Sequence, residues 1–150
     1  MRVGVLIGFI GVALGLNGVA WGSMATPMSR NPDSVLRSGS PIAPEELDFR
    51  GADLAYRDFS YANLDGADFR EADLRHAIFV HASLIEGDLL RSRLKWAELD
   101  YADLQSSRLK QADLRYASLV EVDLRHSDLR RANLMAADLR GADLRSADLR

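Results

Sequence analysis

A Leu or Phe occupies every fifth position from Phe49 to Leu149 without interruption. The apolar face of an α-helix recurs about every 3.6 residues and that of a strand about every two, so neither element has this period. A period of five that is kept over residues 49–149 indicates a repeat architecture, in which each unit packs mainly against its neighbours. The spacing therefore predicts a solenoid rather than a domain built from helices or ordinary sheets.

The residue two positions before each Leu or Phe is small in nearly every unit, and most often it is Ala. Residues two apart in extended backbone point to the same side, so both are expected to face inward. The residue between them, usually Asp, would face outward, and the two residues that follow would turn the chain. Arg57 is the one large charged residue at the small inward position, where we expect its head group to reach solvent.

Four units match one consensus as they stand: Ala52-Asp53-Leu54, Ala72-Asp73-Leu74, Ala112-Asp113-Leu114 and Ala142-Asp143-Leu144. They resemble the repeats of the pentapeptide-repeat family, which look like Ala-Asp-Leu-x-x. The resemblance implies an all-β fold, a right-handed quadrilateral parallel β-helix with four units in each coil. Residues twenty apart would then stack on one face, and residues 47–150 would form about five coils at the spacing of neighbouring strands.

The N-terminal residues have a different composition from the repeats. Met1 and Arg2 precede an apolar run at residues 3–21, and small residues around Ser23 and Ala25 follow it. This order is typical of a secretory signal peptide, with an uncleaved anchor as the alternative, because roughly 20 apolar residues can span a bilayer. We therefore expect a signal peptide or membrane anchor at residues 1–25 and a flexible, Pro-rich linker with a possible N-terminal cap at residues 26–46.

Either interpretation of the N-terminus places the repeats outside the cytoplasm, because the positive charge before the apolar run stays inside. The compartment would be the periplasm, the thylakoid lumen or the extracellular space, with residues 3–21 as an anchor if they are retained.

Composition argues against several classes of function. The chain has no Cys, which excludes disulfides, thiol catalysis and cysteine metal sites. Its histidines, His76, His81 and His126, show no metal-ligand spacing, and a net charge of −3 argues against a general nucleic-acid binder. We therefore expect no catalytic residues, no cofactor, no metal site and no small-molecule substrate.

A coil of twenty residues sorts seven aromatic or imidazole side chains into two neighbouring columns, two positions after the Leu or Phe. The first ring column contains Tyr56, His76, Trp96 and Tyr116, and the second contains Tyr61, His81 and Tyr101. Exposed aromatic clusters often mark binding surfaces, and stacking that merely stiffens the coil is the alternative interpretation. These seven residues are the candidate interaction surface.

Three functional hypotheses remain. The first is an exported, non-enzymatic scaffold that has a structural role or binds an unknown protein partner, with end-to-end stacking as a route to a homodimer. The second comes from the resemblance, because some members of the family look like duplex DNA in shape and charge and regulate DNA gyrase. Residues 49–150 carry eighteen acids and sixteen bases, far from the strong negative charge that such mimicry needs. The third is a membrane-tethered spacer, if residues 3–21 are retained.

Overall fold

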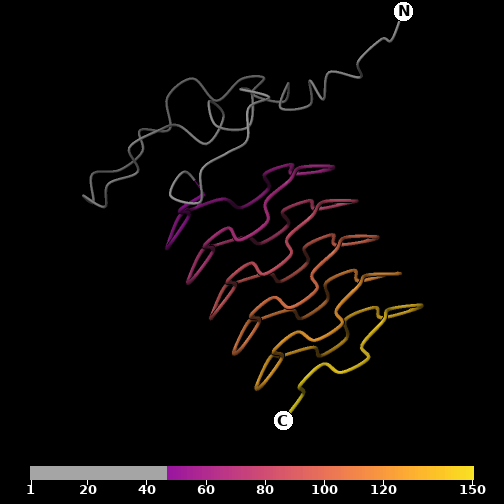
Figure 1. The fold of residues 1–150 in the computed structure, drawn as a ribbon. Helices are drawn as coiled ribbons and strands as arrows, with labels where there is room; N and C mark the ends of the chain where they lie inside the picture. Colours follow the sequence, from indigo (N-terminus) through magenta and orange to yellow (C-terminus); the bar gives the residue numbers. More distant parts are fainter. Residues whose placement is uncertain (1–46) are drawn as a thin grey trace, which may run out of the picture.

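The computed structural model describes residues 47–150, and the signal or anchor expected at residues 1–25 and the linker expected at 26–46 lie outside them. Within residues 47–150 the backbone forms neither a helix nor a strand longer than one bridge residue. It winds as a stack of similar coils from the purple end to the yellow end of Figure 1. No helix in this part of the chain is long and apolar enough to cross a membrane.

The coils are in a register of twenty residues. A parallel bridge pairs the residue before each Leu or Phe with the residue twenty positions later, as it pairs Asp48 with Asp68. The chain turns once every five residues, so a register of twenty gives each coil four turns and the rod four sides. This agrees with the four-sided coil that the family resemblance implied.

Each side of the rod consists of five-residue segments that run from two residues before a Leu or Phe to two residues after it, and that recur every twenty residues. We number the sides by their first Leu or Phe. Side 1 starts with Phe49, side 2 with Leu54, side 3 with Phe59 and side 4 with Leu64.

Backbone hydrogen bonds join each coil to the next. Up to Leu129, the amide of each Leu or Phe donates to the following coil, as Leu54 N does to Asp73 O at 2.8 Å, and Asp73 N donates back to Ala52 O at 2.9 Å. The third residue of the four-residue turn donates a further bond to the next coil, as Tyr56 N does to Arg75 O at 2.9 Å. A fourth bond, such as Arg57 N to Leu54 O at 3.2 Å, closes the turn itself. The backbone is therefore paired along the rod although no extended strand is present.

The Leu and Phe side chains fill the interior, as the spacing predicts. Leu104, in the middle of the rod, is fully buried, with 0% of its surface exposed. At the N-terminal end the core is aromatic, since Phe49 stacks on Phe69 with ring centroids 4.8 Å apart and Phe59 stacks on Phe79 at 5.0 Å. The small inward residues leave the width that these large side chains need.

Polar residues at the inward positions are accommodated in two ways. Ser92, Ser107 and Ser127 are buried, and each Oγ donates a hydrogen bond to the backbone carbonyl three residues earlier, at 2.6 to 2.8 Å. Arg57, the large exception, is half-buried. The interior thus tolerates a hydroxyl that finds a partner inside the coil.

Burial of the interior Leu side chains decreases in the last units of the described chain. Leu149 is 54% exposed, and Leu134, Leu139 and Leu144 are only partly buried. Among residues 47–150 no further coil packs on them. Leu149 therefore contributes less to stability than a Leu in the middle of the rod.

We expect Leu104→Ala to lower the free energy of unfolding by about 2–5 kcal/mol, because it removes buried surface and leaves a cavity inside a closed coil. Leu149→Ala is the matched control, and we expect it to cost about 1 kcal/mol or less because its side chain is already half in solvent. Chemical denaturation followed by circular dichroism measures both. Equal losses in the two variants would contradict the burial gradient.

Candidate interaction surface

Every four-residue turn places its third residue in the left-handed region of backbone conformation. Tyr56, Trp96 and Tyr101 have φ angles of 62°, 61° and 60°. A positive φ at this position, with a hydrogen bond from the fourth residue to the first, is the pattern of a type II β-turn, which favours Gly. Most of these corner positions nevertheless hold larger residues, including all seven members of the candidate interaction surface.

The first ring column is a continuous stack along the rod. Tyr56 and His76 have ring centroids 4.7 Å apart and planes 4° apart, and His76 and Trp96 follow at 5.0 Å and 14°. Trp96 and Tyr116 complete it at 5.7 Å and 18°. Ala136 occupies the next corner of this column, so the stack stops at Tyr116.

The second ring column has the same geometry. Tyr61 and His81 lie 5.0 Å apart with planes at 20°, and His81 and Tyr101 lie 4.9 Å apart at 17°. Glu121 takes the following corner. Side 3 runs between the two corners, so the two columns form its edges.

Stacking leaves much of each ring in solvent. The exposed fraction is 73% for Tyr56, 61% for Tyr61 and 48% for Tyr101, and Trp96 and Tyr116 are 43% and 45% exposed. The structure thus brings all seven predicted side chains together in the two columns. The rings stack from coil to coil, as the alternative interpretation predicts, and they are still exposed enough to contact a partner.

A lysine already lies against the first ring column. Lys95 Nζ is 3.8 Å from the centroid of the Trp96 ring and 5.5 Å from that of Tyr116. An ammonium group within about 6 Å of a ring centroid is attracted by the negative face of the ring. Lys95 belongs to side 2, which meets side 3 at the corner that carries this column.

The Asp before each Leu or Phe has a role that the sequence did not reveal. Its Oδ1 accepts a hydrogen bond from the amide two residues later, as Asp53 does from Ala55 N at 3.3 Å, and Asn63 does the same for Asp65 N at 3.1 Å. These Asx bonds satisfy the first amide of the turn. The recurring Asp is therefore part of the turn and not only an outward charge.

In two units Ser stands in place of this Asp, and an Asp of the preceding coil accepts the hydrogen bond from the turn amide instead. Asp65 Oδ1 accepts from Ile85 N at 3.0 Å and from Ser83 Oγ at 2.5 Å. Asp100 Oδ1 accepts in the same way from Val120 N at 3.0 Å and from the hydroxyl of Ser118 at 2.5 Å. A signal for this exists in the sequence, because each Ser stands eighteen residues after an Asp.

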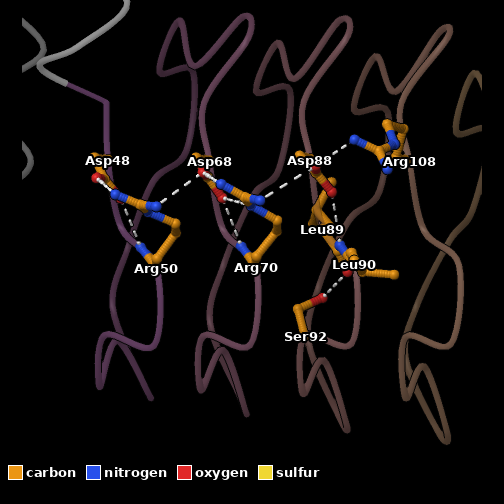
Figure 2. A network of polar contacts seen from close by, with 9 residues as sticks. All are labelled: Asp48, Arg50, Asp68, Arg70, Asp88, Leu89, Leu90, Ser92 and Arg108. Carbon is orange, nitrogen blue, oxygen red and sulfur yellow. Dashed lines mark hydrogen bonds and ion pairs between the residues drawn. The ribbon is translucent and has the colours of Figure 1, made fainter.

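Many of these aspartates also pair with an arginine two residues later. Figure 2 shows such pairs along side 1, where Asp48 faces Arg50 and Asp68 faces Arg70. Arg108 stands where most units have Asp, and its Nη1 reaches back one coil to Asp88 Oδ2 at 2.7 Å. The arginine and aspartate side chains of this side thus form ordered pairs, within and between coils.

The arginine pairs shift the carboxylate pKa values. Hydrogen bonds from Arg115 lower the pKa of Asp113, and those from Arg145 and Arg150 lower the pKa of Asp143 and Asp148 to about 2. Asp143 and Asp148 are half-buried but Arg145 and Arg150 are largely exposed, so these pairs are weak individually.

Charge is distributed unequally around the rod. Within residues 47–150, sides 1 and 2 together carry nine carboxylates and twelve Lys or Arg residues. Sides 3 and 4 carry ten carboxylates and four Lys or Arg residues. The net charge of the whole rod is therefore close to zero although sides 1 and 2 are basic and sides 3 and 4 are acidic. The two ring columns lie at the two edges of side 3, one of the acidic sides.

Metal binding has no evident place in the described part of the rod, because residues 47–150 contain no group of three or more His, Asp or Glu side chains that could hold an ion. His76 and His81 lie inside the ring stacks, and His126 occupies an exposed corner further along.

We expect Trp96→Ala to keep the fold but to lower the free energy of unfolding by roughly 1–3 kcal/mol, because it removes two ring contacts. Ser106→Ala is the matched control, since Ser106 has the same left-handed conformation at an exposed corner of the next segment but one and stacks on no ring. Thermal unfolding measures the difference. A loss no larger than that of Ser106→Ala would show that the rings contribute nothing to stability.

We also expect the stability of the rod to fall as the pH drops from about 4 to about 2. The folded-state pKa of Asp113, Asp123 and Asp143 lies below the ordinary value of 3.8, so their contribution is complete above that value and is lost as they become protonated. Changing all three to Asn keeps an acceptor for each turn and removes the titration. Denaturation at several pH values should give this variant the shallower slope, and identical slopes would contradict the assignment.

Comparison with known proteins agrees with the geometry. The family profile described as pentapeptide repeats matches residues 48–84, 77–115 and 117–150, with 8 copies. No curated protein matches the chain.

Solved structures with the same fold include a pentapeptide repeat protein from the thylakoid lumen of Arabidopsis thaliana, at 28% identity and a TM-score of 0.69, covering 76% of this chain and 78% of that one. A second is the pentapeptide repeat protein Rfr23 from the cyanobacterium Cyanothece 51142, at 33% identity and a TM-score of 0.60, covering 62% of this chain and 64% of that one. With the five-residue spacing, the register of twenty and the profile match together, the chain belongs to the pentapeptide-repeat family.

Proposed function

We propose that this chain is an exported, non-enzymatic scaffold whose side 3, with the two ring columns at its edges, binds another protein. The observation that carries the proposal is the concentration of exposed rings, since Tyr56, Tyr61 and Tyr101 are each about half or more in solvent on one side of the rod. Tyr and Trp are enriched among the residues that dominate protein interfaces.

The scaffold role is supported by the fixed conformation of these side chains in the unbound protein. Each ring is held by its corner backbone and by a neighbour 4.7–5.7 Å away, so little side-chain freedom is left to lose on binding. Hydrogen-bonded coils also keep the distance between the columns fixed. A partner would therefore meet a surface that is already in its binding conformation.

Export is supported by the apolar N-terminal run and by the relative from a thylakoid lumen. Retention of residues 3–21 would make the same rod a membrane-tethered scaffold. Mass spectrometry of the mature protein distinguishes the two, because cleavage predicts a start close to Thr26 and a tether predicts an intact N-terminus in the membrane fraction.

Regulation of gyrase by DNA mimicry is the weaker alternative. The rod carries twelve Lys or Arg residues on sides 1 and 2 alone, and a duplex-like surface would need negative charge on all sides.

The scaffold proposal predicts that full-length protein carrying both Trp96→Ala and Tyr101→Ala loses a protein that the wild type captures. The control carries Glu71→Ala and Gln111→Ala, which change two exposed corners of side 1 with the same left-handed conformation. Affinity capture from the source cell envelope, with quantitative mass spectrometry, compares the three proteins.

A partner retained by the wild type and the control but reduced about tenfold or more by the ring variant supports the proposal. If all three proteins capture the same set in the same amounts, side 3 is not the binding surface.

A further inference from the structure

We infer that the partner segment bound by side 3 is basic, a stretch of polypeptide that presents Arg and Lys side chains. This inference rests on the proposed function, because it specifies the chemistry of the partner for the same surface. Three features of side 3 lead to it: its carboxylates, its rings and its apolar floor.

Between Asp58 and Glu121 the carboxylates of side 3 lack the arginine partners that the aspartates of side 1 have, whereas Asp138, further along side 3, pairs with Arg140. From Asp58 to Glu121 the outward positions of this side also carry Glu98 and Asp100, and none of these positions holds Lys or Arg. Within residues 47–150, neither Glu98 nor Asp100 forms an ion pair, and the cation that interacts electrostatically with Asp100 is Arg140, two coils further along the same column. Side 1 is different, since its aspartates meet arginines within and between coils (Figure 2).

The ring columns are suited to cations, and one of them already holds one. Lys95, a residue of side 2, places its Nζ 3.8 Å from the centroid of the Trp96 ring. The first ring column also borders side 3, whose outward positions supply no such cation between Asp58 and Glu121. A partner's ammonium or guanidinium group would find rings and carboxylates together there.

The surface of side 3 between the two ring columns includes apolar side chains that can pack against the methylene groups of Arg and Lys. Ile78, Val80 and Val120 occupy outward positions of side 3 and are half-buried. Arg and Lys bury their methylene stems on apolar surface while their charged ends stay near water or a carboxylate. Acidic partners and nucleic acids, by contrast, would be repelled by Glu98, Asp100 and Glu121.

The test uses full-length protein and a short labelled peptide of alternating Arg and Ser, with the peptide of alternating Glu and Ser as its counterpart. Fluorescence anisotropy gives both affinities at low and at physiological ionic strength. We expect the Arg peptide to bind, the Glu peptide not to bind, and the affinity for the Arg peptide to fall as salt screens the carboxylates.

The decisive variant carries Glu98→Gln and Asp100→Asn. Asn at position 100 still offers an oxygen to Ser118 Oγ and Val120 N, so the turn is preserved. The matched control carries Asp53→Asn and Glu71→Gln, which remove two carboxylates from sides 2 and 1 and keep the acceptor for Ala55 N. We expect the first variant to weaken binding of the Arg peptide about fivefold or more and the control to leave it nearly unchanged.

Equal affinity of all three proteins for the Arg peptide, or equal binding of the Glu peptide, would overturn the inference. The ring variant Trp96→Ala with Tyr101→Ala separates this outcome from a failure of the proposed function. Loss of the captured partner in the ring variant, with no preference for the Arg peptide, keeps the scaffold surface and removes its basic preference. Binding of the Arg peptide that depends on Glu98 and Asp100 but not on the rings contradicts the ring columns as the binding surface.

Discussion

The backbone hydrogen bonds between coils are the interaction on which everything else in this rod depends. They fix residues twenty apart above one another, and every column of the molecule follows from that register. The Leu and Phe columns then fill the interior. Asp53 and its equivalents accept hydrogen bonds from turn amides that have no backbone partner in the neighbouring coil. Each bond is modest by itself, and the regular repetition makes them cooperative between neighbouring coils.

The corners convert this regularity into a surface. A side chain with φ near 60° projects from the edge of the rod, at a modest cost in backbone energy for any residue but Gly. Tyr56, Trp96 and Tyr101 accept that conformation, and ring stacking offsets part of the cost. The same stacking presents the rings at the edges of the acidic side 3. The contacts that make the ring columns rigid therefore also position the rings for binding a partner.

The sequence predicted the interior well, and the reason is simple. A period of five in Leu and Phe leaves one economical way to bury those side chains, and the seven rings fall into columns as soon as twenty residues make a coil. The left-handed corners were not predicted, because Tyr and Trp are poor indicators of positive φ. Turn capping by Asp was missed for a similar reason, since an outward Asp looks the same whether it faces water or an amide.

The polarity around the rod was also missed, although the sequence contains it. Charge summed over residues 49–150 is nearly balanced, and only sorting by side separates Glu98 and Asp100 from the arginines of side 1. Such sorting needs the register and the assignment of each charged residue to a side of the rod. Arg57 is exceptional both in the sequence and in the structure. It is a half-buried cation at an inward position that holds a small residue in nearly every other unit.

The register of twenty also sets two different units for change in this chain. Adding or deleting five residues would leave Leu or Phe at every interior position, so the core would tolerate it. The same event would rotate all later surface residues by a quarter turn, so five residues added between His76 and Trp96 would separate these two rings while Trp96 stays stacked on Tyr116. Lengthening by twenty keeps the pattern on each side intact, so the fold can grow in steps of one repeat while a binding surface can grow only in steps of a whole coil.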